Sequence, residues 1–252
     1  MKKKLLLRTP LLVALSLVLI ISYSCKKTVK VENNEENKNI TFNSSITYGS
    51  IKDVENNNYK TVAIGTQVWM AENLKSTKYK NGELIGTTTP ATLMIAGESA
   101  PKYQWAYAGK ESNVADYGRL YTWYAVTDSR GVCPSGWHVP STSEWTTLID
   151  YCGGASFAGG NLKETGSIHW PIPTIVSSNS SGFTALPGGC RSADVGDNIA
   201  LFLYIDLYGN WWSSTATLQG NAESFLLSTG SNYGGMSVGL MYEGFSVRCV
   251  KD

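Results

Sequence analysis

Five cysteines are the side chains with which this 252-residue chain could most easily do covalent chemistry. Only a thiolate attacks efficiently, so a catalytic cysteine needs a neighbouring base or cation that lowers the pKa of its thiol. Arg191 follows Cys190 directly and could have that effect. An oxidase that works through two thiols would also need a close pair of reactive cysteines, but Cys190 and Cys249 are 59 residues apart and neither has a cysteine neighbour. We therefore predict no catalytic cysteine.

The two histidines, His138 and His169, do not form a recognisable catalytic or metal-binding pattern. A zinc site needs further histidine, cysteine or carboxylate ligands at short spacing, and neither histidine has them. A serine hydrolase would need a nucleophile elbow, and no Gly-x-Ser-x-Gly sequence is present. A structural hydrogen bond is the commoner role for a histidine in a turn, which is where His138 is expected. The sequence predicts no catalytic residue, no metal and no cofactor.

Tyrosines suggest recognition rather than catalysis. Residues 191–243 are rich in Asn, Ser and Gly and hold several tyrosines and tryptophans, a composition typical of adaptable binding loops. We expect Trp211 and Trp212 to lie in the core. The predicted ligand-binding residues are Tyr204, Tyr208, Asn232 and Tyr233. The three tyrosines among them are expected to be exposed on one face, with Trp145, Trp211 and Phe245 buried beneath.

The N-terminus has the features of a signal peptide, predicted over residues 1–24. Lys2, Lys3, Lys4 and Arg8 form a basic region, and Leu11–Ile21 is an apolar run that is too short to cross a bilayer stably. Small residues precede Cys25, as in a bacterial lipobox. We predict that Cys25 is the lipidated first residue of the mature protein, although an ordinary secretory peptide stays open. Several acyl chains would anchor the protein to the membrane, since each buried methylene contributes about 0.8 kcal/mol.

Net charge argues against nucleic acid as a partner. The chain has 21 basic and 20 acidic side chains, and the leader holds four of the basic ones, so the mature chain has 17 against 20, a balance of −3. Nucleic-acid binding needs a concentrated basic face. Residues 25–47 carry the lipid attachment site and a polar, Asn-, Glu- and Lys-rich stretch that predicts a flexible tether. Residues 48–252 are long enough for one domain with a substantial core.

The clearest predicted element is a helix over residues 142–152. Ser141 can cap it and Glu144 completes a capping box, while Trp145, Leu148, Ile149 and Cys152 share one face. Residues 117–126 also have helical spacing. Near the C-terminus, Phe245, Val247 and Cys249 alternate with Ser246, Arg248 and Val250, which predicts a half-buried terminal strand.

Four motifs, in this order, resemble the Fibrobacter succinogenes major paralogous domain, from about Ile51 to Asp252. They are Tyr117–Val126, the sequence CPSGWHVPSTSEW at Cys133–Trp145, Ala185–Gly189, and GFSVRCV at Gly244–Val250. That family is abundant in envelope proteins of the Bacteroidetes, so the resemblance implies an envelope location, which we expect to be the outer membrane. The family commonly has cysteines at the positions of Cys133 and Cys249. With Cys25 lipidated, four cysteines remain, and we pair Cys133 with Cys249 and Cys152 with Cys190.

Three stretches also resemble the formylglycine-generating sulfatase-modifying family. They are His138–Trp145, Gly209–Trp212 and Gly244–Cys249. The resemblance implies an α+β fold of the C-type-lectin-like kind, as a single domain with two helices, small antiparallel sheets and long loops. Calcium-dependent lectins of this kind use Glu-Pro-Asn or Gln-Pro-Asp, which this chain lacks. Oxygen ligands for calcium could still come from Asp194, Asp197, Asn198 and Asp206, so a calcium site stays open.

The sequence therefore favours an envelope lipoprotein that presents one non-catalytic domain for binding a glycan or a protein. Two alternatives stay open. The first is an envelope enzyme related to the sulfatase-modifying family, and the second is a purely structural surface protein without a discrete ligand.

Overall fold

The computed structural model describes residues 39–171, 177–192 and 199–252. The predicted signal peptide, the lipidation site Cys25 and most of the predicted tether lie outside these residues. Within them, no helix is both long and apolar enough to cross a membrane.

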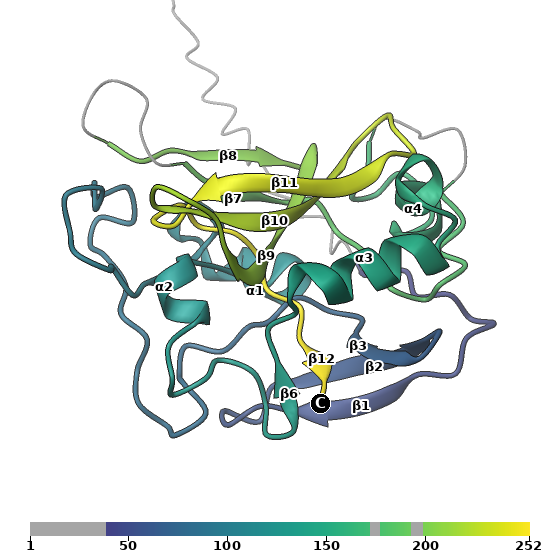
Figure 1. Cartoon of the computed structure of the whole chain (residues 1–252), viewed down its shortest axis with the longest axis horizontal. Coiled ribbons are helices and arrows are strands. Elements are labelled where there is room, and N and C mark those ends of the chain that lie inside the picture. Colours follow the sequence, from purple (N-terminus) through teal and green to yellow (C-terminus); the bar gives the residue numbers. More distant parts are fainter. Residues whose placement is uncertain (1–38, 172–176, 193–198) are drawn as a thin grey trace, which may run out of the picture. The chain divides into compact units, whose positions relative to one another are not determined.

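The first sheet joins the beginning of the domain to its end. Its five strands are antiparallel and have the order β1-β2-β3-β12-β6, so the C-terminal strand lies between strands from early and middle parts of the chain (Figure 1). The strands are β1 (Gly49–Lys52), β2 (Asn58–Ile64), β3 (Gln67–Met70), β6 (Trp137–His138) and β12 (Val250–Lys251).

The second sheet is built mainly from the last third of the chain. It has the order β11-β10-β9-β7-β8 and is antiparallel except for one parallel pairing of Gly189 in β7 with Gly209 in β9. Its strands are β7 (Gly188–Arg191), β8 (Phe202–Ile205), β9 (Tyr208–Ala216), β10 (Asn221–Ser228) and β11 (Gly234–Leu240). A third sheet consists of β4 (Gln104–Ala106) and β5 (Arg119–Tyr121) alone.

Helices are few and short. The two longest described ones are α3 (Thr142–Tyr151) and α4 (Ala155–Leu162), and the single turns are α1 (Val114–Tyr117), α2 (Trp123–Val126) and the 3₁₀ turns η1 (Tyr107–Gly109) and η2 (Glu111–Asn113). The predicted helix is confirmed, because the Ser141 side chain caps α3 and Glu144 completes the capping box. The fold is thus a mixture of a few helices with antiparallel sheets.

The helix predicted over residues 117–126 is wrong as a continuous element. The chain ends α1 at Gly118, extends as β5 and then turns again as α2. Gly118 has a φ of 70°, and a Cβ at this position would stand 2.8 Å from the carbonyl oxygen of Leu74, so the close approach requires glycine. Pairing of β5 with β4 overrides the local helical spacing.

The hydrophobic core is divided into two clusters. The first core cluster includes Tyr121, Trp212 and Phe245, and the second includes Trp145, Trp211 and Phe225.

The C-terminal segment, which runs from β11 to β12 (Figure 1), contributes side chains to both clusters. Phe245, Val247 and Cys249 belong to the first core cluster and Val250 to the second. Arg248 between them is fully buried and donates hydrogen bonds to the carbonyl oxygens of Phe183 and Thr184 and to Asn73. The prediction of a half-buried strand is therefore wrong, because protein covers the segment on both sides.

One predicted disulfide is present and the other is not. Cys133 and Cys249 are bonded, with their Cα atoms 5.9 Å apart. Cys152 and Cys190 are free and buried, which corrects the predicted Cys152–Cys190 bond. The physical reason is their location, since Cys152 packs in the second core cluster and Cys190 in the first.

The domain begins earlier than predicted. Phe42 and Ile46 pack against the second core cluster, and the backbone N–H of Thr41 donates to the Glu164 carboxylate at 2.5 Å. Lys60 lies over the Phe42 ring, 5.1 Å from its centroid. Residues 39–47, which we predicted to be part of the tether, are therefore packed on the domain.

Candidate functional site

Three of the predicted binding residues form an exposed group, named here the tyrosine face: Tyr204, Tyr208 and Tyr233. Their exposed fractions are 50%, 37% and 52%, so the predicted exposure is confirmed. Tyr204 in β8 and Tyr208 at the start of β9 contact each other edge to face, with ring centroids 5.1 Å apart. The turn between them brings Leu207 to the surface as well, at 37% exposure.

Strand register places Tyr233 on the same side of the second sheet as Tyr208. Asn210 pairs with Leu226, which pairs in turn with Gly235, so these three residues share a face. Tyr208 precedes Asn210 by two residues and therefore points to that face too. The Tyr233 ring lies over Gly235, because a Cβ there would be 2.4 Å from the tyrosine hydroxyl.

The opposite side of these strands is filled by aromatic packing. Trp145, Trp211 and Phe225 are fully buried, and Trp145 stacks on Phe225 with ring centroids 4.8 Å apart. Phe245 is buried as predicted, but it packs on Trp212 in the first core cluster, at 4.3 Å, and not with Trp145 and Trp211. A rigid layer therefore supports the face, which keeps the entropy cost of presenting its rings low.

A buried lysine fixes the turn that carries Tyr233. Lys163 follows α4 and is fully buried, and its ammonium group donates to the carbonyl oxygens of Ser228 and Ser231, each at 2.5 Å. Burial lowers the pKa of Lys163 to about 8. Nothing in the sequence predicted this role, because an isolated lysine ordinarily lies at the surface.

The fourth predicted binding residue, Asn232, joins the turn to α4. Its carbonyl oxygen accepts from the backbone N–H of Gly159 at 2.8 Å, and a Cβ at Gly159 would be 2.7 Å from that oxygen. The side-chain oxygen of Asn232 is buried and has no hydrogen-bond partner among the described residues. Asn232 thus orders the turn through its backbone, while its Oδ1 atom faces inward.

The β8–β9 turn is also tied to the interior. Tyr117 at the end of α1 donates a hydrogen bond from its hydroxyl to the Asp206 carboxylate, and the Tyr117 ring packs edge to face on buried His169, with centroids 5.5 Å apart. Nδ1 of His169 lies 2.6 Å from the carboxylate of buried Glu164. His169 is therefore part of the support beneath the turn. Of the calcium candidates, Asp206 is engaged by Tyr117, and Asp194, Asp197 and Asn198 lie outside the described residues.

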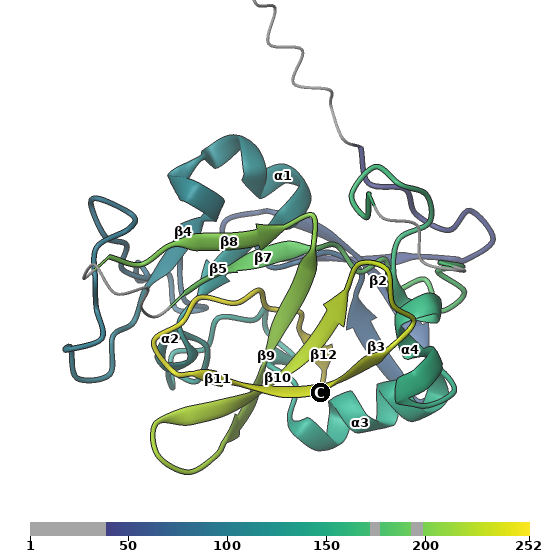
Figure 2. The same cartoon turned by 90° about the horizontal axis from the view of Figure 1, so that it is seen from above.

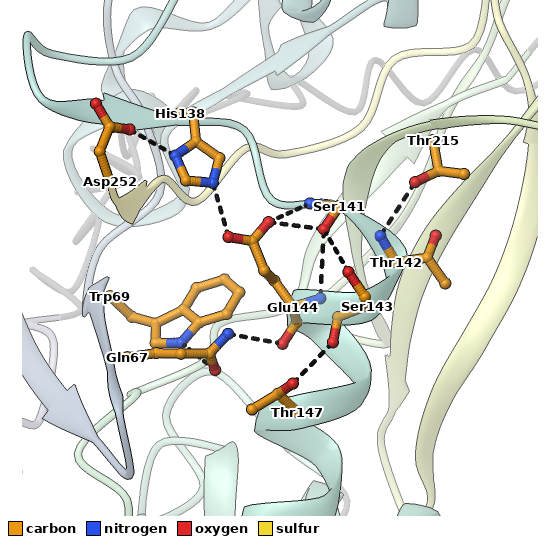
Figure 3. Close-up of polar contacts among 10 residues, drawn as sticks. All are labelled: Gln67, Trp69, His138, Ser141, Thr142, Ser143, Glu144, Thr147, Thr215 and Asp252. Atoms are coloured by element: carbon orange, nitrogen blue, oxygen red, sulfur yellow. Dashed lines mark hydrogen bonds and ion pairs between the residues drawn. The ribbon is translucent and has the colours of Figure 1, made fainter.

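His138 forms a polar cluster at the C-terminus, shown in Figure 3. Its Nδ1 atom lies 2.6 Å from the carboxylate of Asp252 and its Nε2 atom 2.8 Å from that of Glu144. The other oxygen of Glu144 accepts from the backbone N–H and hydroxyl of Ser141. Both ring nitrogens are thus engaged by carboxylates, and Ser141 in turn holds that of Glu144 in place.

The ionisation of this cluster follows from these contacts. Partial burial acts to lower the pKa of His138, but the hydrogen bonds to Asp252 and Glu144 outweigh it and raise the pKa above its usual value. Burial acts to raise the pKa of Glu144, but hydrogen bonds from Ser141 lower it overall. His138 holds the C-terminal residue against the start of α3, which is the structural role expected for it.

The free thiols lack the surroundings of a nucleophile. Burial raises the pKa of Cys152 to about 11 and that of Cys190 to about 12. Arg191 does not activate Cys190, because its guanidinium group donates to the carbonyl oxygens of Ala91 and Leu93 and lies over the Trp105 ring. In the described part of the chain, no three His, Cys, Asp or Glu side chains are arranged to hold a metal ion.

A comparison with protein families identifies the family of this chain. The model of the Fibrobacter succinogenes major domain matches residues 62–251. The chain belongs to this family. The matched range contains the disulfide, α3, the tyrosine face and, apart from Asp252, the His138 cluster. No curated protein and no solved structure matches the chain.

Proposed function

We propose that this protein is an envelope lipoprotein whose Fibrobacter succinogenes major domain binds a glycan through the tyrosine face. The observation that carries the proposal is the grouping of Tyr204, Tyr208 and Tyr233 on one side of a sheet whose other side is a packed aromatic layer. Exposed rings on a rigid support give contact area without a large loss of entropy on binding.

Carbohydrate fits this surface for two reasons. Sugar rings present C–H faces that pack on tyrosine rings, and their hydroxyl groups need polar partners nearby. Asn210 and Ser228 are half-buried beside Tyr208 and offer an amide and a hydroxyl. A protein ligand would bury the same rings but would need a larger surface, about 800 Å² on each partner.

A glycan array tests the proposal, with the full chain applied in the presence and absence of calcium. The proposal expects a reproducible signal for at least one glycan class, and excess of that free glycan should compete it away. A uniformly blank array in both conditions would contradict glycan binding. Loss of the signal when calcium is removed would show that glycan binding requires calcium. An unchanged signal would indicate that the tyrosine rings make the main contacts with the glycan.

We also propose the C-type-lectin-like architecture for this domain. In its support, two of the three stretches whose sequences suggested it, His138–Trp145 and Gly209–Trp212, meet in the second core cluster, where Trp145 and Trp211 both pack on Phe225. An experimental structure with a different strand order around this cluster would contradict it.

Membrane attachment through lipidated Cys25, with an outer-membrane location, completes the proposal. The supporting feature is the basic and apolar leader that precedes Cys25. Mass spectrometry of the mature N-terminus decides the point, since an unmodified start at another residue would exclude the anchor. Cys25→Ala should move the protein from the membrane fraction to the soluble fraction.

A further inference from the structure

A polar cavity of about 430 Å³ lies between the β4–β5 sheet and the loop that precedes it. Its lining residues include Thr87, Thr88, Thr89 and Gln104. Its charged lining residues are Arg119 and Glu111. The volume is within the range of small-molecule sites. This threonine cavity shares no residue with the tyrosine face.

Arg119 is held in position before any ligand arrives. It lies in β5 and is mostly buried, and its Nε atom donates to the carbonyl oxygen of Lys75 at 3.0 Å. Its Nη1 atom donates to the Gln104 side-chain oxygen at 3.1 Å. These two bonds fix the plane of the guanidinium group. Its Nη1 and Nη2 atoms form a two-pronged donor, and this fork points at Glu111.

Glu111 completes a bidentate arrangement with this fork. One carboxylate oxygen accepts from Nη1 of Arg119 at 3.1 Å and the other accepts from Nη2. The partners differ sharply in burial, since the side chain of Arg119 is 11% exposed and that of Glu111 is 70% exposed. Glu111 stands on η2, just before α1, and α1 lies beside β8 in Figure 2. Tyr107 of η1 contacts Phe202 of β8, with ring centroids 5.5 Å apart.

Because of this difference in burial, a ligand carboxylate could displace Glu111 from Arg119. An ion pair with an exposed partner gains little free energy, because water solvates the carboxylate almost as well. A carboxylate brought by a ligand would form the same two bonds with Arg119. It would also bring neighbouring groups into contact with the cavity, which the short Glu111 side chain cannot do.

The rest of the wall selects for hydroxyl groups. Thr87 and Thr89 are exposed at the rim, and Thr88 inside accepts from the indole N–H of Trp105 at 2.9 Å, which leaves its own hydroxyl hydrogen available to donate. A second guanidinium, that of Arg191, lies behind Trp105 at 4.1 Å from the ring centroid. Its Nη1 atom is buried and has no hydrogen-bond partner within the described part of the chain.

We propose that the threonine cavity binds the carboxylate of an acidic sugar, a hexuronic acid unit, with Arg119 as the carboxylate ligand and Glu111 as its internal substitute. The sugar carboxylate displaces Glu111 from the fork, and the threonine hydroxyls and Gln104 contact the sugar hydroxyl groups. The site adds a charge-selective contact that the tyrosine face does not have.

Calorimetric titration of the full chain with galacturonic acid tests the assignment, with its methyl ester as the uncharged control and an N-acetylated dipeptide as a carboxylate without a sugar. The acid should bind and the ester should bind at least about tenfold more weakly, as expected when a charged hydrogen bond is lost. Equal binding of acid and ester would overturn the proposal. Tighter binding of the dipeptide than of the acid would overturn the sugar assignment.

Two variants separate the roles of the paired residues. Glu111→Gln removes the competing charge at an exposed position and should tighten binding of the acid by about 3- to 5-fold, the size of an exposed ion pair. Arg119→Lys removes the bidentate fork and should weaken it about tenfold or more. An unchanged or weaker affinity in Glu111→Gln would contradict the displacement, whatever the stability of Arg119→Lys. Tyr151→Ala, at a position that is 63% exposed and outside both the threonine cavity and the tyrosine face, should leave this affinity unchanged.

Discussion

Replacement of Trp211 by alanine should destabilise the domain strongly, because this residue is core and not part of a binding surface. Its side chain is fully buried and contacts Phe225, with ring centroids 5.9 Å apart. Its indole N–H donates to Oδ1 of Asn73 at 2.8 Å. Truncation of a buried tryptophan costs about 3–5 kcal/mol, and loss of the hydrogen bond contributes about 1 kcal/mol.

Trp211→Phe separates these two contributions. It keeps an aromatic ring against Phe225 and removes the indole N–H, so about 1–2 kcal/mol should be lost. Asn73 is not left unpaired in this variant, because its Oδ1 atom also accepts from Nε of buried Arg248 at 2.9 Å. The cost should therefore stay at the lower end of that range.

Urea unfolding of the oxidised protein, followed by circular dichroism, measures these free energies. Tyr208→Ala provides a matched aromatic control on the same strand, and its exposed side chain should cost no more than about 1 kcal/mol. A cost below about 1.5 kcal/mol for Trp211→Ala would refute the assignment of Trp211 to the core. An equal loss of unfolding free energy in Trp211→Ala and Tyr208→Ala would also refute the assignment of Trp211 to the core.

Three further predictions follow from the cysteines and from His138. Cys152 and Cys190 should react slowly with a thiol reagent at neutral pH in the folded protein and at once in denaturant, since burial raises the pKa of both thiols; rapid labelling of either folded thiol would contradict this. Replacing both Cys133 and Cys249 by alanine should lower the free energy of unfolding by about 4–5 kcal/mol, as expected for a loop of this length, and a loss under about 1 kcal/mol would show that the bond constrains little. The pKa of His138 is raised in the folded state. The stability that its ion pairs contribute should therefore be fully present below its unfolded pKa of about 6.5 and should be lost as pH rises through the folded pKa. The stability difference between the wild type and His138→Gln should therefore shrink on going to alkaline pH, and a difference that grows there would refute the ion-pair assignment.

Local signals in the sequence predicted local structure well. The capping box of Ser141 and Glu144 and the apolar spacing from Trp145 onward predict α3, because a helix is specified by neighbours along the chain. Tyrosines within an Asn-, Ser- and Gly-rich stretch predicted exposure at Tyr204, Tyr208 and Tyr233, which the structure confirms. The Cys133–Cys249 pairing came from family resemblance and not from spacing.

Features that depend on contacts distant in sequence were not predictable. The helical spacing around Leu120 and Trp123 is overridden in β5 because this strand pairs with β4. An even number of cysteines suggested a Cys152–Cys190 bond, but parity says nothing about which core cluster each thiol enters.

The burial of three cationic side chains could not be predicted from the sequence. Lys163, Arg191 and Arg248 are all fully buried, whereas most lysines and arginines are solvated. Each donates to backbone carbonyl oxygens, and such acceptors cannot be identified from residue type. The support beneath the Tyr233 turn was missed for this reason.

The most direct test of the binding proposal is the affinity of a Tyr204→Ala/Tyr208→Ala double variant for the glycan class found on the array. Tyr151→Ala is the matched control, since Tyr151 is 63% exposed and lies on α3, outside the tyrosine face. Stacking on a tyrosine contributes about 1 kcal/mol, so the double variant should bind about tenfold or more weakly while Tyr151→Ala binds as the wild type does. Unchanged affinity in the double variant, with its fold intact, would contradict the tyrosine face as the binding site.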